Sequence, residues 1–545
     1  MKKYSVGIDF GTLSARAVLL DLESGKEIAD REFAYPHGVI GGDYFEGITL
    51  DKSVALQHPQ DYLDALSVTV KGVIADSGVA PEDIIGIGID FTASTDLPVT
   101  ADGTPLCFLP EYENRPHAYV KLWKHHGASK EADEMTELAV KMGEKWIDSY
   151  GGRISSEWLF PKLLEVKRGD EEVYNAAAYF MEAADWLVWL LTGEKTHNSC
   201  MAGYKALWNA QTGYPSNEYL SALGLDGAVG TKVSENVIAT GTKAGQVSAS
   251  GAALSGLCEG TAVTAPIIDA HAAFPATGIV DDGKMLMILG TSGCHIIMDK
   301  QDKDVKGIAG KVKDGISAGY VAYEAGQSSS GDNYAWFVNN CVPEAYSDEA
   351  EERGISIHQL LTEKASALKI GQSGLISIDW LNGNRTPYSD SELSGMILGL
   401  NLNTKPEEIY RAMLEATVFG TKRIIDVYEE GGVAVNELYA SGGIARKNPF
   451  LMQMYSDVLG KEIRVAKSTQ AGAKGSAIMG AVAGGYYPDL KEAAARLADG
   501  CDQVYTPCAE RTEKYLRLYD EYLTLSKYFA EENGVMRRLK DIANG

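Results

Sequence analysis

Two hydrophobic segments of the chain share one pattern of apolar and polar positions. In the first, residues 6–10 form an apolar run, a Gly-Thr-Leu-Ser turn follows, and residues 17–20 form a second apolar run before Asp21. The second segment, residues 285–299 (MLMILGTSGCHIIMD), repeats the order of apolar run, small-residue turn, apolar run and Asp. Two short apolar runs joined by such a turn predict a β-hairpin.

The two turns lie about half a chain apart. Their Gly-Thr pairs begin at positions 11 and 290, a separation of 279 residues (290 minus 11) in a chain of 545. A second pair of segments repeats the theme, because residues 84–95 (IIGIGIDFTAST) and 438–443 (LYASGG) each run from apolar positions into small residues. Self-similarity at half the length predicts a duplicated domain. Chance similarity between short strands is the alternative.

Helical patterns lie between these strands. Thr404 to Glu407 form a capping box with Pro406 in the first turn, which predicts a helix over residues 409–428, ended by Gly431-Gly432. Near the C-terminus, the apolar positions between residues 515 and 529 follow the spacing of one helix face. Strands alternating with helices indicate an α/β fold. The chain has no flexible linker, so we predict two domains, residues 1–280 and 281–545, joined by a tight hinge.

Composition narrows the class of protein. The chain is 45% hydrophobic and 23% charged, which is ordinary for a globular protein and excludes a disordered or fibrous one. Its formal net charge is -25, which argues against nucleic acid or a membrane surface as the main partner. Seven cysteines without a Cys-x-x-Cys pair favour a reducing compartment. Without a signal-peptide pattern or a long apolar run, we expect a cytoplasmic protein.

The first turn carries residues that suit a phosphate group. Gly11 permits close backbone approach, and the hydroxyls of Thr12 and Ser14 with nearby N–H groups can surround an anion. Arg16 can add a forked cationic contact, and Asp9 is placed to hold Mg²⁺ through water. A plain hairpin with a capped turn explains the same residues equally well. The turn is neither a Walker loop nor a dinucleotide fingerprint.

The second turn, with Gly290 and Thr291, favours the phosphate-binding interpretation over a plain hairpin. Two such turns at equivalent positions of a duplicated chain suggest two loops that hold one polyphosphate from opposite sides.

The sequence resembles the FGGY family of carbohydrate kinases over essentially its whole length. The matching segments occur in the family's order and are DFGTLSAR (9–16), SSEWLFPKLLEV (155–166), IIDAHAAFPATG (267–278), GTSGCHIIMD (290–299), YEAGQSSSGDNYAWF (323–337), SGGIARKNPFLMQMYSDVLG (441–460) and GSAIMGAVAGG (475–485). Within the family, GIDFTAST (88–95), AGYKALWN (202–209), GQSSSGD and GGIARKNP are most similar to bacterial ribulokinases.

The resemblance implies two duplicated actin-like (ribonuclease H-like) ATPase domains that face each other across a nucleotide cleft. It implies ATP and Mg²⁺ as cofactors and assigns the general base to Asp269. A carboxylate suits that role, since a sugar hydroxyl has a pKa far above neutral and must lose its proton as the bond to phosphorus forms. An N-cap Asp is the competing interpretation.

Two charged residues stand inside apolar, small-residue tracts. Lys205 and Glu324 are of types that are rarely buried unless paired or bound to a ligand. The ribulokinase-like tracts place both in the sugar pocket, with the backbone of Ala93 beside them. A structural ion pair is the alternative.

Segment 441–448 resembles the family's adenosine loop. Gly442 and Gly443 would let a purine lie on bare backbone, and Asn448 would reach the base or ribose from the rim. Gly326 is expected on the nucleotide side as well. The alternative is that this segment has no ligand and only forms the turn before a helix that begins at Pro449.

The resemblance implies ATP-dependent phosphorylation of L-ribulose to L-ribulose 5-phosphate, in L-arabinose catabolism, as the expected activity. A kinase for D-ribulose, D-xylulose or a pentitol such as ribitol is the alternative within the enzyme class. An actin-like or Hsp70-like ATPase and a sugar-sensing regulator are the alternatives from other classes. The expected partners are the sugar and ATP, and a homodimer stays open as the oligomeric state.

Overall fold

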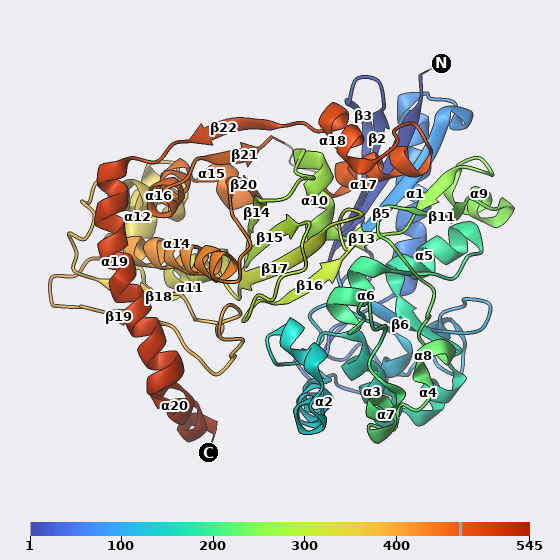
Figure 1. Cartoon of the computed structure of the whole chain (residues 1–545), viewed down its shortest axis with the longest axis horizontal. Coiled ribbons are helices and arrows are strands. Elements are labelled where there is room, and N and C mark those ends of the chain that lie inside the picture. Colours follow the sequence, from blue (N-terminus) through green and yellow to red (C-terminus); the bar gives the residue numbers. More distant parts are fainter. Residues whose placement is uncertain (1, 468–470, 545) are drawn as a thin grey trace.

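The computed structural model describes residues 2–467 and 471–544, and each half of the chain contains a seven-stranded sheet (Figure 1). The first sheet follows the order β11-β12-β5-β1-β2-β3, with β13 also paired to β5. Its strands are β1 (Tyr4–Phe10), β2 (Ser14–Asp21), β3 (Glu27–Ala34), β5 (Ile84–Phe91), β11 (Lys243–Gln246), β12 (Ala262–Thr264) and β13 (Ile267–Ile268).

The second sheet follows the order β16-β17-β15-β14-β20-β21-β22. Its strands are β14 (Lys284–Leu289), β15 (Gly293–Asp299), β16 (Gly310–Lys313), β17 (Val321–Gln327), β20 (Glu437–Ser441), β21 (Ile463–Ala466) and β22 (Cys501–Tyr505). β14 pairs antiparallel with β15 and parallel with β20, as β1 does with β2 and β5. The two sheets therefore share one strand order, and the predicted duplication and both predicted hairpins are confirmed.

A smaller lobe is inserted in the first half. Its sheet combines β4 (Leu56–Gln57), β6 (Asp96–Val99), β7 (Val120–Lys121) and β8 (Tyr179–Glu182). The helices of the first half are α1 (Pro59–Ser77), α2 (Ser129–Met142), α3 (Leu159–Gly169), α4 (Glu171–Ala176), α5 (Ala183–Thr192), α6 (Ser199–Lys205), α7 (Asn217–Ala222), α8 (Ala228–Thr231), α9 (Ala249–Ser255) and α10 (Asp269–Thr277), and two further short strands are β9 (His197–Asn198) and β10 (Val237–Ile238).

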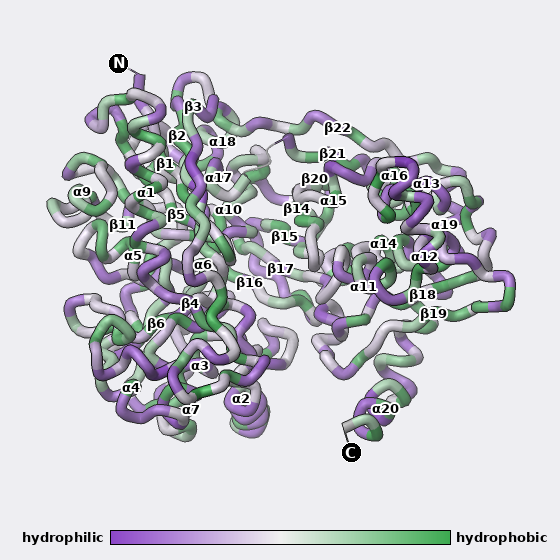
Figure 2. The backbone as a smooth tube through the Cα atoms, turned by 180° about the vertical axis from the view of Figure 1, so that it is seen from behind, coloured by the Kyte–Doolittle hydropathy of each residue, from purple (hydrophilic) through white to green (hydrophobic). Residues whose placement is uncertain are grey.

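The remaining helices belong to the second half. They are α11 (Gly331–Cys341), α12 (Glu344–Glu352), α13 (Ile357–Ser366), α14 (Pro406–Glu430), α15 (Gly443–Lys447), α16 (Pro449–Leu459), α17 (Ala471–Ala483), α18 (Leu490–Leu497), α19 (Ala509–Lys527) and α20 (Val535–Asn544), with a two-stranded sheet of β18 (Ile376–Ile378) and β19 (Met396–Leu398). Separate apolar cores fill the two halves and the inserted lobe. Hydrophobic and hydrophilic stretches alternate along the backbone of both halves (Figure 2).

One helix of the second half covers the sheet of the first. α17 lies against β1 and β5, where three strand residues are glycines, Gly7, Gly86 and Gly88. A Cβ atom added to Gly88 would lie 2.0 Å from the carbonyl oxygen of Ser476, and one added to Gly86 would lie 2.0 Å from that of Gly480. Helix and sheet thus meet backbone to backbone, which only glycine permits.

One detail of the helix predictions is wrong. The predicted capping box at Thr404 and Glu407 is shifted by one residue, because Glu408 accepts the hydrogen bond from the backbone N–H of Lys405 at 2.9 Å. Thr404 instead accepts from the N–H of Asn401 at 3.0 Å. The helix face predicted near the C-terminus lies on α19 and on the π-helical turn that follows Lys527, and a separate helix, α20, comes after that turn. Within the described ranges, no helix is both long and apolar enough to cross a membrane.

Candidate functional site

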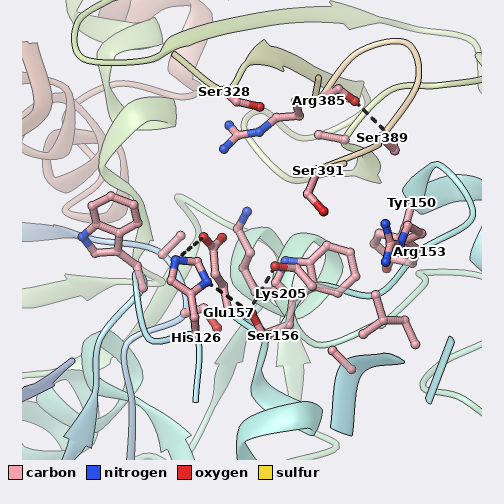
Figure 3. A pocket seen from close by; sticks show the side chains of 18 of the residues that line it. His126, Tyr150, Arg153, Ser156, Glu157, Lys205, Ser328, Arg385, Ser389 and Ser391 are labelled. Carbon is pink, nitrogen blue, oxygen red and sulfur yellow. Dashed lines mark hydrogen bonds and ion pairs between the residues drawn. The ribbon is translucent and has the colours of Figure 1, made fainter. Parts of the chain in front are cut away.

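A cavity of about 710 Å³ is lined by residues of both halves of the chain. The first half contributes Thr12, the segment 92–94, residues of the inserted lobe, Lys205 and Asp269, and the second half contributes Ser292, Glu324 and the loop 382–392. The cavity is therefore lined by all four residues that the sequence predicts for substrate binding, Ala93, Lys205, Asp269 and Glu324. Figure 3 shows Lys205 and Arg385 reaching into this cavity from opposite sides.

Three aspartates come together where strands of the first sheet end. Asp9 and Asp90 are register partners in the parallel pair β1–β5. β13 also runs parallel to β5, and Asp269 follows it directly as the first residue of α10. Carboxyl ends of parallel strands share one sheet edge, which is where open α/β sheets bind ligands.

The buried carboxyl groups of Asp9 and Asp90 have few neighbouring groups that would stabilise their negative charges. Burial raises the pKa of Asp9, and burial together with the charge of Asp9 raises the pKa of Asp90 well above its ordinary value. Ser476 of α17 donates a hydrogen bond to Asp90 Oδ2 at 2.6 Å, whereas Asp90 Oδ1 is buried without a partner among the described residues. Gly472 leaves space beside both groups, since an added Cβ atom would lie 2.8 Å from Asp9 Oδ2.

Asp269 is not the helix cap that the competing interpretation proposes. It lies within α10, whose N-cap residue is Ile268, and its Oδ1 accepts from the N–H of the next residue, Ala270, at 2.6 Å. Burial and the charge of Asp9 raise the pKa of Asp269 to about 7. A carboxyl group with this pKa exchanges protons close to neutral pH.

Glu324 contacts a residue that the sequence analysis did not single out. Its Oε2 lies 3.1 Å from Nε2 of His271, and no ion pair with Lys205 is found in the described part of the chain. Burial alone would raise the pKa of Glu324, but Lys205, His271 and Arg385 together lower it to about 2. Glu324 is therefore ionised near Lys205 and Arg385, and a direct Lys205–Glu324 ion pair does not explain either residue.

Lys205 is held at the end of α6 by its neighbour. Tyr204 stacks on the ring of His271 with centroids 4.9 Å apart, and its hydroxyl donates to the carbonyl of Ala322 in β17 at 2.7 Å. The Tyr204 side chain thus ties the helix that carries Lys205 to the strand that carries Glu324. The Nζ of Lys205 is left to extend into the cavity (Figure 3).

The loop that contains Ala93 is held in position by a buried lysine, Lys162. Ser94 has φ of 52°, an uncommon backbone conformation for a residue with a side chain. Lys162 donates to the carbonyl of Ser94 and to Asp96 Oδ2, the latter at 3.0 Å, with both side chains fully buried. The buried pair holds the strained loop in place, and Ala93 of this loop lines the cavity.

The predicted residues of the first turn divide into two sets. Gly11 and Thr12 form the turn itself, closed by the hydrogen bond from Gly11 N–H to the carbonyl of Ser14 at 3.0 Å. Thr12 Oγ1 accepts from the indole N–H of Trp123 at 3.1 Å. Ser14 and Arg16 lie along β2, and both donate to the carboxylate of Glu32 on β3. Neither lines the cavity, so phosphate binding by these two residues stays a prediction.

The second turn adjoins the predicted purine loop. The carbonyls of Gly290 and Thr291 accept from the N–H groups of Gly331 and Ser330 at 3.0 and 2.8 Å. Gly442, after β20, has φ of 95°, and an added Cβ atom would lie 2.4 Å from the carbonyl of Leu289. The structure therefore brings Gly442 next to the strand end that leads into Gly290.

The remaining predicted nucleotide residues have varied settings. Gly443 is exposed, and nothing lies within 4 Å of a Cβ atom added there. Asn448 caps α16, which begins at Pro449 as predicted, by accepting from Leu451 N–H at 3.0 Å. Gly326 lies in β17, where an added Cβ atom would be 2.7 Å from the carbonyl of Gly293. The role of each in nucleotide binding stays a prediction.

Four residues of the site were missed at the sequence level. They are Asp90, Trp123, His271 and Arg385. A signal for Asp90 was present, because the tetrapeptide Gly-Ile-Asp-Phe occurs at 7–10 and again at 88–91, and the sheet pairs the two copies in register. The other three reach the site through loops and a helix whose course no local pattern reveals.

Comparisons with known proteins agree with this architecture. Residues 4–274 match the N-terminal domain, and residues 285–484 the C-terminal domain, of the FGGY family of carbohydrate kinases. The ribulokinase of Bacillus licheniformis is 48% identical over 539 residues, 98% of this chain and 98% of its own. The ribulokinase of Anoxybacillus flavithermus is 48% identical over 547 residues, 99% of this chain and 97% of its own.

Among solved structures, the xylulose kinase of Rhodospirillum rubrum superposes with a TM-score of 0.81 at 21% sequence identity, covering 97% of this chain and 99% of its own. That likeness concerns the fold, and it agrees with the two repeated sheets, which form the expected pair of actin-like ATPase domains. Both family models together span most of the chain, and the chain belongs to the FGGY family of carbohydrate kinases.

Proposed function

We propose that this chain uses ATP to phosphorylate L-ribulose, with L-ribulose 5-phosphate and ADP as products. The observation that carries the proposal is the cavity on which Ala93, Lys205, Asp269 and Glu324 meet. It combines an ionised carboxylate, an amine and backbone groups, which suit the hydroxyls of a polyol. Relatives with 48% identity over nearly the whole chain carry the name ribulokinase, which supports the choice of sugar.

Asp269 acts as the general base in this proposal. With a pKa of about 7, a large share of Asp269 is ionised at neutral pH. The carboxylate takes the proton of the terminal C5 hydroxyl as the hydroxyl oxygen forms its bond to the γ-phosphorus of ATP, and the bond from that phosphorus to the β–γ bridging oxygen breaks. Lys205 and Glu324 orient the sugar for this attack, and closure of the two halves would limit hydrolysis of ATP by water.

Asp9 and Asp90 are the residues that would hold Mg²⁺. Among the described residues no group of three His, Cys, Asp or Glu side chains is arranged for a metal, so water and phosphate oxygens would complete the shell. That agrees with the preference of Mg²⁺ for one or two carboxylates plus water and phosphate. The unpaired Asp90 Oδ1 and the space above Gly472 fit such an ion. When bound, Mg²⁺ neutralises charge on the phosphate oxygens.

ATP would lie between the two turns. Thr12 on one side and Thr291 on the other offer a backbone N–H group and a hydroxyl to the phosphates. Gly11 and Gly290, whose own N–H groups close the two turns, would let the phosphates approach the backbone. Gly442, Gly443 and Asn448 would contact adenosine, since their loop adjoins the second turn. Ser14 and Arg16 would have to leave Glu32 to reach a phosphate, and Gly326 would contact the nucleotide through its backbone.

The test is an ATP-coupled assay over L-ribulose, D-ribulose, D-xylulose and ribitol. The proposal expects the highest kcat/KM on L-ribulose, with weaker activity on the others, because inverting one hydroxyl breaks a hydrogen bond that is worth about 1–3 kcal/mol in a polar site. Highest kcat/KM on another pentulose or pentitol would transfer the assignment to that sugar. Inactivity on all four would reject it.

Three further points belong to the proposal. The domain boundary is placed between residues 280 and 281, in the segment between α10 and β14. The cytoplasm is the proposed compartment, which the seven free cysteines support. A homodimer is the proposed oligomeric state to be tested first, by light scattering of the purified protein.

A further inference from the structure

Arg385, a cation of the cavity wall, has no side-chain partner among the described residues. Arg385 belongs to the loop 382–392, and its side chain extends into the cavity (Figure 3). Its carbonyl oxygen accepts from Ser389 Oγ at 3.1 Å. Across residues 2–467 and 471–544, however, nothing accepts a hydrogen bond from its guanidinium, and no carboxylate pairs with it. The planar fork of donors that arginine offers to phosphate and carboxylate is therefore free.

The guanidinium lies close to Gly326 of β17. A Cβ atom added to Gly326 would lie 3.4 Å from Arg385 Nη1 and 2.7 Å from the carbonyl of Gly293, the residue that follows the turn 290–292. Gly326 and Glu324 are two positions apart on β17, so they face the same side of the strand. Arg385 thus lies beside the strand that carries Glu324, near the residue that follows the second turn.

The charges of the cavity call for an anion at this place. Lys205 and Arg385 extend toward each other from opposite walls (Figure 3), and Glu324 is the carboxylate whose pKa both of them lower. His271 already contacts that carboxylate at 3.1 Å. Glu324 offsets the charge of only one of these two cations. A phosphoryl group next to Arg385 would offset the other.

We propose that Arg385 binds the phosphoryl group during its transfer and holds it on the newly formed sugar phosphate. The proposal rests on the kinase activity proposed above and adds a phosphate-binding residue to it. The phosphorus exchanges its bond to the β–γ bridging oxygen of ATP for a bond to the C5 oxygen, and the hydroxyl proton goes to Asp269. Arg385 exchanges no proton and donates two parallel hydrogen bonds to the equatorial oxygens.

The loop that carries Arg385 is anchored at a distance from the cavity. Asp390 accepts from Arg537 Nε of α20 at 3.0 Å, and the carbonyl of Ser391 accepts from Lys540 Nζ at 2.6 Å. On the other side, Ser389 Oγ lies 2.5 Å from where a Cβ atom of Gly151 would be. Contacts with both halves therefore fix the position from which Arg385 reaches the cavity.

The test compares binding of L-ribulose with binding of L-ribulose 5-phosphate, by calorimetry, in the parent enzyme, Arg385→Gln and Arg385→Lys. We expect Arg385→Gln to weaken binding of the 5-phosphate by at least about 30-fold and to change binding of the free sugar by less than about threefold. We also expect kcat to fall by at least about 10²-fold. Arg385→Lys should recover part of the lost phosphate affinity, since it keeps the charge without the fork. Arg353→Gln, an exposed residue paired with Glu363, is the matched control and should change neither affinity.

Three results would overturn the proposal. Equal weakening of both ligands by Arg385→Gln would make Arg385 a sugar-orienting or structural residue, and unchanged binding of both would remove it from the site. Inorganic phosphate serves as a second probe that is independent of the sugar. Loss of its competition with the 5-phosphate in Arg385→Gln supports the proposal, and retention contradicts it. Absence of pentulose kinase activity in the parent enzyme would reject the proposed function, whereas the inorganic phosphate result would still decide the role of Arg385.

Discussion

Glu324 Oε2 lies 3.1 Å from His271 Nε2, and the two residues come from different halves of the chain. His271 stands in α10, two positions after Asp269, and its Nδ1 lies 3.2 Å from the Sγ atom of Cys200. Glu324 stands in the middle of β17. The contact therefore connects the helix of the proposed base with the sheet of the opposite half, and it orients a carboxylate at the cavity wall.

Glu324→Gln should damage sugar binding selectively. The substitution keeps the shape of the side chain but removes the charge that Lys205, His271 and Arg385 stabilise. A hydrogen bond to a charged group contributes about 1.5–3 kcal/mol, so the KM for the sugar should rise roughly 10- to 150-fold while the KM for ATP stays within about threefold. Steady-state kinetics with each substrate varied in turn measure this. Glu510→Gln, an exposed helix position, is the control, and a rise confined to the KM for ATP would contradict the assignment.

Asp269→Asn should lower the rate of phosphoryl transfer while ATP binding is kept. The loss of a general base lowers kcat by roughly 10²–10⁴, and ATP binding should persist. Because the ionised form accepts the proton and its pKa is about 7, kcat/KM of the parent should rise with pH up to about 7 and then level off. A profile that is flat from about pH 5.5 to 8.5, or turnover within tenfold of the parent, would exclude Asp269 as the base.

The same raised pKa makes a prediction for unfolding. Folding favours the protonated form of Asp269, so its contribution to the free energy of unfolding is present at low pH and is lost between the ordinary value of 3.8 and about 7 as pH rises. Asn cannot ionise. The thermal midpoint of Asp269→Asn relative to the parent should therefore be higher at about pH 8 than at about pH 5, and the opposite order would contradict this account.

Gly443→Val should weaken ATP binding without unfolding the protein. A Cβ atom at Gly443 meets nothing within 4 Å, so the side chain fits the free structure and would obstruct only a ligand lying on that backbone. We expect the KM for ATP to rise at least about tenfold, with the sugar KM and the thermal midpoint nearly unchanged. Gly442→Val is the contrasting variant, because φ of 95° and the nearby Leu289 carbonyl predict a folding defect. A normal KM for ATP in Gly443→Val would remove the purine from this loop.

Gly88→Ala should destabilise the whole chain. Its methyl group would lie 2.0 Å from the Ser476 carbonyl, and both backbones are held in regular elements, so the helix must move away from the sheet. Overpacking of this kind costs about 1–3 kcal/mol or more. Differential scanning calorimetry should show a clear fall in the unfolding midpoint. Gly41→Ala, where a Cβ atom meets nothing within 4 Å, is the control, and equal midpoints for the two variants would contradict the packing argument.

Local sequence patterns predicted the parts of the fold whose hydrogen bonds are local. The hairpins at Gly11 and Gly290 and the helix that begins at Pro449 all occur where adjacent residues determine the backbone. The capping box was misplaced by one residue, because both Glu407 and Glu408 can reach a neighbouring N–H and the sequence does not rank them. The change from α-helix to π-helix after Lys527 was not predicted, since the apolar spacing continues across it.

The site was only partly predictable, because several of its residues meet only in the folded structure. Asp269, Lys205 and Glu324 were found through the family resemblance, but their partners were not. His271 pairs with Glu324 across the two halves, and Arg385 is brought near Gly326 by a loop anchored on α20. Such contacts join positions far apart in sequence, and neither periodicity nor composition encodes them.

The position of α17 sets an order of events during synthesis. The glycine-lined face of β1 and β5 cannot be covered until residues 471–483 have been made, 383 residues (471 minus 88) after Gly88. At roughly 5–20 residues per second, that face waits roughly 20–80 s on the ribosome. The N-terminal half alone should therefore expose an apolar sheet surface and depend on chaperones, and co-expression of its missing helix as a separate peptide should increase its yield in soluble form.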